Sequence, residues 1–261
     1  MDGQLLVLQM AIGLASGVIM SLVGASAVMV IVPSLTLLLG YSMHVAIGVS
    51  LMVDVLASTV IGYSYWRHGN VDIGNSFWIA VGSIIGAQLG AGFTVALPDV
   101  LLAISYGLWM ITAGITIWKK GFDRTAIVGR LSRFVQFDSK PMKIGVALFL
   151  GFFIGLNCGV FGAGGGVLIM MVLMFVLDYP IQSAIGTSTV MMALTAASAT
   201  VGYLLQGNVA VSTGIIISAG TIIGGTAGVR FVSASDERLL SRVVGGVFVV
   251  LGLIMTALRF I

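Results

Sequence analysis

The chain has few charged residues, one cysteine, two histidines and four prolines in 261 residues. Charged side chains make up 8% of the chain and hydrophobic ones 59%, whereas soluble domains carry about 25% charged residues. Because so little charge cannot cover a water-soluble globule, the composition predicts an all-α integral membrane protein. The single cysteine, Cys158, excludes a fold held by internal disulfides.

Catalytic and nucleotide-binding motifs are also missing. Cys158, His44 and His68 lie far apart in the chain, and no HExxH or GxSxG pattern occurs. We therefore expect no enzyme activity, no cofactor and no metal, although an intramembrane enzyme is an alternative. No ATP-binding motif occurs either, so an ion gradient or the substrate's own gradient is expected to drive any transport. Most basic residues lie in one loop, which is not a nucleic-acid-binding pattern.

Ten apolar stretches fill the chain, and a helix needs about 20 apolar residues to cross a bilayer. The stretches lie near 5–22, 27–39, 44–66, 75–96, 101–118, 145–161, 166–177, 182–205, 211–231 and 239–260. The polar residues between the two groups of five hold seven of the twelve basic residues. The positive-inside rule places them in the cytoplasm. We divide the chain into a first transmembrane repeat (1–118), a basic cytoplasmic linker (119–143) and a second transmembrane repeat (144–261).

The two repeats are copies of one sequence pattern. The segment AIGVS (46–50) matches AIGTS (184–188), and GSIIGAQLG (82–90) matches GTIIGGTAG (220–228). Positions 46 and 184 differ by 138, as do 82 and 220, and this register holds without a gap from about residue 17 to residue 117. So long an ungapped match indicates a duplication.

The basic residues change places between matched loops. Arg67 and His68 have no basic counterpart in the second copy, whereas Arg230, Arg238 and Arg242 have none in the first. An inverted second copy would bring all of these loops to the cytoplasm, so the swap favours inverted repeats.

Glycines interrupt the first apolar region of each copy, as in CGVFGAGGGVLIMM (158–171). A straight helix over 5–39 would be roughly 50 Å long, against a hydrocarbon core of about 30 Å. Each copy is therefore predicted to contain a glycine-broken helical hairpin with a short second arm, followed by three helices, giving 8–10 membrane segments. The alternative is one long, tilted and broken helix per copy, with a parallel repeat.

A helix break inside a membrane survives where it is buried in protein or lines a polar cavity. It frees backbone N–H groups at a helix N-terminus, which favours an anion. We expect Gly165 to adopt a positive φ there, and we expect the two breaks to meet near the midplane and hold the substrate.

At these residues the chain resembles the TauE/SafE family of sulfite- and sulfonate-type anion permeases. The second copy carries GAGGG (162–166) and AIGTS (184–188), whereas the first carries GASAV (24–28) and VPSL (32–35) and so lacks the glycine run. The resemblance implies a multi-pass secondary transporter of the inner cell membrane for small sulfur-containing anions such as sulfite, thiosulfate or organosulfonates. A transporter or channel for another small anion, or for a cation, is the alternative.

The candidate substrate-binding residues offer backbone, hydroxyl, amide or thiol groups at the two breaks and the matched motifs. They are Gly24, Ala25, Ser26, Ser50, Asn157, Cys158, Gly162, Gly164, Gly165, Gly166, Thr187 and Ser188. Other roles are open for several of them: glycines can serve close packing, hydroxyls can bond their own helix, and a buried cysteine can be an inert apolar side chain.

Asp54 lies within an apolar stretch, at the position matched by Met192. An ionisable residue inside a membrane is a functional candidate. A carboxylate repels an anion, so we assign Asp54 to proton coupling, with a structural hydrogen bond as the alternative. The expected partners are a small anion and the lipid bilayer, with monomer and homodimer both open.

Overall fold

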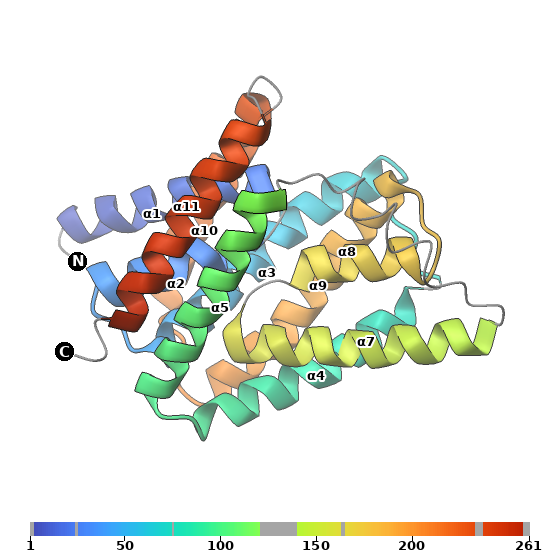
Figure 1. Ribbon diagram of the computed structural model, residues 1–261, viewed down its shortest axis with the longest axis horizontal. Coiled ribbons are helices and arrows are strands. Elements are labelled where there is room, and N and C mark those ends of the chain that lie inside the picture. Colours follow the sequence, from blue (N-terminus) through green and yellow to red (C-terminus); the bar gives the residue numbers. More distant parts are fainter. Residues whose placement is uncertain are drawn as a thin grey trace.

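The computed structural model describes residues 3–23, 26–74, 76–120, 140–162, 165–232 and 237–257. These residues form ten α-helices and no strand, in two sets of five (Figure 1). The first set is α1 (Gly3–Val23), α2 (Val28–Leu38), α3 (Met43–Arg67), α4 (Phe77–Val95) and α5 (Asp99–Lys120). The second set is α7 (Lys140–Phe161), α8 (Gly165–Phe175), α9 (Ile181–Leu205), α10 (Val211–Val232) and α11 (Glu237–Ala257). The all-α fold and its ten apolar segments are confirmed.

Six of the described helices are long and apolar enough to cross a membrane: α1, α3, α4, α5, α7 and α9. The other four contain shorter apolar stretches, at Val28–Leu38, Gly165–Met174, Val211–Ala227 and Val244–Ala257. Most of the predicted linker lies outside the described residues, and α7 already begins at Lys140.

The first two helices of the chain form the predicted hairpin. Gln9, in α1, donates a hydrogen bond to Thr213 Oγ1 (3.3 Å), and the hydroxyl of Tyr41, just after α2, lies 3.0 Å from the same oxygen. The residues on either side of the break, Gln9 and Tyr41, therefore lie next to the same residue of α10. The chain must fold back between them, which rules out one long broken helix. With 11 residues, α2 is the short arm.

Matched turns end α3 and α9. Gly69 (φ 74°) and Gly207 (φ 73°) take the left-handed conformation that glycine adopts without a steric penalty. The N–H of Asn70 then donates to Tyr65 O, and the N–H of Asn208 donates to Tyr203 O. The repeated GNV sequence is thus a helix-ending turn in both copies.

Glycines join the two copies at two equivalent helix pairs. On α4, a Cβ at Gly82, Gly86 or Gly90 would overlap the backbone of Leu148, Phe152 or Leu156 on α7, so these helices run parallel in close contact (Figure 1). In the equivalent pair, Gly13 and Gly17 of α1 meet the backbone of α10 in the same way. Small residues at such spacing allow two membrane helices to approach closely.

Equivalent helices of the two copies cross antiparallel at the centre. Along α3 and α9, Gly48 lies against Tyr203, Gly62 against Val190, and Gly186 against Tyr65. Along α5 and α11, Gly107 lies against Gly252 and Gly114 against Gly245. The inverted orientation of the copies across the membrane stays a prediction, and this antiparallel packing supports it.

A methyl group on the α4–α7 contact tests the close approach. We expect Gly86→Ala to lower the free energy of unfolding by about 1–3 kcal/mol, because its Cβ would overlap the Phe152 carbonyl oxygen. Gly92→Ala, on the same helix, is the matched control because a Cβ there meets no heavy atom within 4 Å. Thermal unfolding in detergent measures both, and equal melting temperatures would contradict the packing.

Cysteine labelling tests the orientation of the copies. Ile73 and Val211 are matched residues, 49% and 45% exposed, that follow the matched turns. In a Cys158→Ala background, we expect Val211→Cys to react with a membrane-impermeant maleimide on intact cells. Ile73→Cys, beside the basic end of α3, is expected to react only after permeabilisation. Equal labelling of both on intact cells would favour parallel repeats.

Candidate functional site

The two helix breaks lie beside the middle of the two central helices. Ser26 and Ala27, just before α2, contact Asp54 midway along α3. Gly165, the first residue of α8, lies against Met192 midway along α9. Asp54 and Met192 are the residues matched by the repeat, so the two breaks have equivalent positions in the fold.

The first break is filled by an aspartate. Ser26 Oγ donates to Asp54 Oδ2, and the N–H of Ala27 donates to Asp54 Oδ1 (3.1 Å). The N–H of Val28, the first residue of α2, donates to Ser26 Oγ (3.2 Å). The carboxyl group therefore caps the start of α2, where the helix dipole favours a negative charge.

The second break turns at Gly162, not at Gly165. Gly162 has a φ of 72° and its N–H donates to Cys158 O (2.7 Å). The expectation of a positive φ at Gly165 is wrong, because Gly165 is already the first helical residue of α8. The left-handed residue that ends α7 is thus three positions before the helix restarts.

The two breaks meet, as expected from the repeat. A Cβ built on Gly162 would lie 3.2 Å from Val28 Cγ1 and 3.3 Å from both Ile47 Cγ2 and Ser50 Oγ. The turn of the second copy therefore packs directly on the start of α2 and on α3. Ser50 belongs to this contact, although its hydroxyl also donates to Ile47 O.

Two sulfur atoms lie beside the start of α8. A Cβ on Gly165 would lie 2.6 Å from Met192 Sδ and 3.7 Å from Cys158 Sγ. Gly166 has more room, since its nearest neighbour in the same test is Met192 Cγ at 3.9 Å. Cys158 is fully buried and Met192 nearly so. In this conformation, the methionine side chain fills the space beside the α8 N-terminus.

Two tyrosines hold the backbone next to the breaks. The hydroxyl of Tyr106, on α5, donates to Val28 O (3.1 Å), and that of Tyr203, on α9, donates to Gly159 O (3.0 Å). Both side chains are fully buried. Sequence reasoning missed them, and Tyr106 could not be found from the repeat because its matched residue is Val244.

The remaining candidates are placed as follows. Thr187 accepts a hydrogen bond from the Asp72 N–H (3.0 Å), so its hydroxyl is engaged by the loop after α3 and not by a break. Ser188 donates to Ile185 O in its own helix. Asn157, five residues before Gly162, has a buried Oδ1 that accepts no hydrogen bond from the described residues. Gly24, Ala25 and Gly164 lie outside the described residues.

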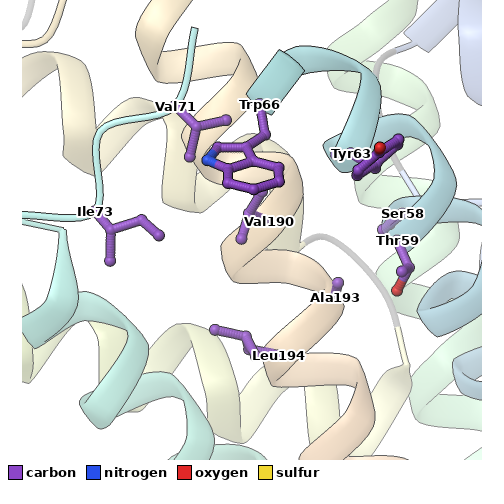
Figure 2. A pocket seen from close by; sticks show the side chains of 10 residues that line it. Ser58, Thr59, Tyr63, Trp66, Val71, Ile73, Val190, Ala193 and Leu194 are labelled. Carbon is purple, nitrogen blue, oxygen red and sulfur yellow. The ribbon is translucent and has the colours of Figure 1, made fainter. Parts of the chain in front are cut away.

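The described break residues Ser26, Ala27, Gly162 and Gly165 are buried, and two pockets formed by described residues lie elsewhere. One, of about 300 Å³, lies between α3, α9 and the loop after α3, lined by apolar groups such as Trp66, Val190 and Leu194 (Figure 2). The other, of about 440 Å³, lies where α2 ends and is lined by Tyr41, Ser42 and Asp99 among others. Neither is lined by a break residue.

Comparison with known proteins places the chain among membrane transporters. The family model described as sulfite exporter TauE/SafE matches residues 9–255. The probable membrane transporter protein YunE of Bacillus subtilis is 24% identical over 260 residues, which cover 94% of this chain and 95% of the relative. YdhB of the same organism is 26% identical, covering 86% and 89%. MJ0441 of Methanocaldococcus jannaschii is 22% identical, covering 96% and 95%. Both are also described as probable membrane transporter proteins. No solved structure gives a significant match.

Proposed function

The chain belongs to the TauE/SafE family, and from this membership we propose that it carries small sulfur-containing anions, such as sulfite, thiosulfate or organosulfonates, across the inner cell membrane. It is a membrane transporter of the TauE/SafE type and not an enzyme. The observation that carries the proposal is the meeting of two helix breaks beside the middle of α3 and α9.

The substrate anion is assigned to the second break. The first turn of α8 has backbone N–H groups without partners within the helix, and these are the donors that hold anions at helix N-termini. Gly165 and Gly166 carry no side chain, so an anion can approach these N–H groups closely once Met192 moves aside. Methionine is suited to such a movement because its side chain is unbranched and flexible.

Transport requires the region between the two breaks to open to each side of the membrane in turn. Ser26, Ala27, Asp54, Cys158, Gly162 and Gly165 are all buried. The pairs α4–α7 and α1–α10 are equivalent, glycine-packed and made of one helix from each copy. We assign alternating access to rocking of these two pairs about the breaks, as in other inverted-repeat transporters.

Chemistry at the break favours an anion over a cation. A helix N-terminus presents donors and a positive dipole end, whereas a cation needs oxygen ligands. Among the described residues at the breaks, the carboxyl group is that of Asp54, and it already accepts hydrogen bonds on both oxygens. Another small oxyanion would fit the same donors, and a ligand screen separates these substrates.

Ligand-induced stabilisation of purified protein tests the proposal. We expect sulfite, thiosulfate, sulfoacetate, isethionate or taurine to raise the melting temperature of the protein. Sulfate and chloride, each added as the sodium salt, are the comparison anions. Gly165→Ala is expected to weaken this binding at least about tenfold, or 1.4 kcal/mol, because its methyl group occupies the anion's approach and pushes against Met192 Sδ.

Gly145→Ala is the matched control, since a Cβ there meets nothing within 4 Å and the residue lies far along α7 from the break. Loss of folding in Gly165→Ala without a specific loss of binding would assign the glycine to packing. Stabilisation by sulfate or chloride alone would redirect the proposal to another anion.

Asp54 is assigned to proton coupling. Among the described residues, the titratable groups that interact with Asp54 include the buried side chains of Tyr106 and Cys158. Since asparagine keeps the shape of the side chain but cannot exchange a proton, we expect Asp54→Asn to abolish the pH dependence of substrate flux into proteoliposomes. Unchanged pH dependence in Asp54→Asn would give Asp54 a structural role.

A further inference from the structure

The two breaks are equivalent in the fold but differ in one matched pair of side chains. Asp54 of α3 faces the start of α2, and Met192 of α9 faces the start of α8. Ala27 and Gly165 are also matched, and each is in contact with the respective side chain. The same backbone arrangement therefore meets a carboxyl group in one copy and a thioether in the other.

At the first break the carboxyl group takes the donors that an anion would use. One oxygen accepts from the Ala27 N–H and the other from Ser26 Oγ, while Ser26 in turn accepts from the Val28 N–H. Such a pattern of backbone and hydroxyl donors around two oxygens is how a helix N-terminus holds a bound anion. Here the two oxygens belong to a side chain of the protein.

Among the residues that the structure describes, no basic side chain forms a salt bridge with Asp54. Wherever burial is defined in the described residues, Asp54 is the only charged side chain that is buried. The salt bridges among these residues join His44 to Asp99 and Lys143 to Asp178. The hydrogen-bond partners of Asp54 are thus the donors of the break and not a basic side chain.

We propose that the Asp54 carboxyl group is tethered in the anion position of the first break, so that the second break alone receives substrate. The assignment of substrate to the second break rests on the proposed function, whereas the filling of the first break does not. As a result, one transporter molecule binds one anion at its centre, although the fold contains two equivalent breaks. At the second break, neutral Met192 leaves the α8 donors for an anion from solution.

Replacement of the tethered carboxylate by a free one tests the first half of this inference. In Asp54→Ala, a space the size of a carboxyl group adjoins the same donors, and sodium formate supplies a free carboxylate that fits it. We expect formate to raise the melting temperature of Asp54→Ala by about 3 °C or more over its effect on wild type. Asp54→Asn is the matched control, because its amide still fills the space.

Equal stabilisation of the three proteins by formate would overturn the proposal. So would an Asp54→Ala protein that cannot be purified folded even in formate while Asp54→Asn can. Because formate is tested without any sulfur compound, these results hold whether or not the substrate class is correct.

A carboxylate placed at the second break tests the other half. Met192→Asp puts into the second copy the side chain that fills the first, so it should compete with the substrate. Met192→Asn has nearly the same shape without the charge. We expect the sulfur anion that best stabilises wild type to bind Met192→Asp at least tenfold more weakly than Met192→Asn. Equal affinity of the two variants would place the substrate away from the second break.

Discussion

Backbone N–H groups freed inside an apolar fold must find acceptors, and this constraint shapes the centre of the molecule. Breaking the first helical region of each copy exposes such groups at the start of α2 and of α8. The first copy meets the requirement with its own Ser26 and Asp54. The second copy has a glycine turn at Gly162 and sulfur side chains around Gly165. The chemical difference between the two breaks is the basis for assigning substrate to the second break alone.

The repeated sequence motifs hold the breaks in place by pairing with each other. A Cβ on Gly48 would overlap the Asn208 carbonyl oxygen, and a Cβ on Gly186 would overlap that of Asn70. The AIG segment of each copy therefore receives the GNV turn of the other. Since these contacts fix α3 against α9, they also set Asp54 and Met192 at equivalent positions along the two helices. The two repeated motifs therefore form two equivalent contacts between the copies, each made of AIG from one copy and GNV from the other.

Apolar length and the repeat predicted much of this fold, because both are properties of the chain itself. The hairpin followed from a stretch too long for a bilayer, and the equivalence of the breaks followed from the constant offset. Contacts between helices were harder to predict. Thr187 shares a motif with Ser50 but bonds the loop after α3, and Tyr106 reaches Val28 O from a helix whose repeat partner has valine there. A repeat shows which positions correspond, but not which side chains meet across them.

The difference between Asp54 and Met192 determines how many anions a fold with two equivalent breaks would hold during one transport cycle. Rocking of the α4–α7 pair against the α1–α10 pair exchanges equivalent packing, so on the proposed mechanism the two end states resemble each other with the copies interchanged. Two open breaks would then place two anions side by side, where they repel each other in a region of low dielectric constant. When Asp54 is ionised, the same repulsion exists before substrate enters, and the entering anion meets a charged side chain that already holds the donors of the first break. A proton on Asp54 would remove the repulsion, which joins the tethered anion and the proposed coupling site in one side chain.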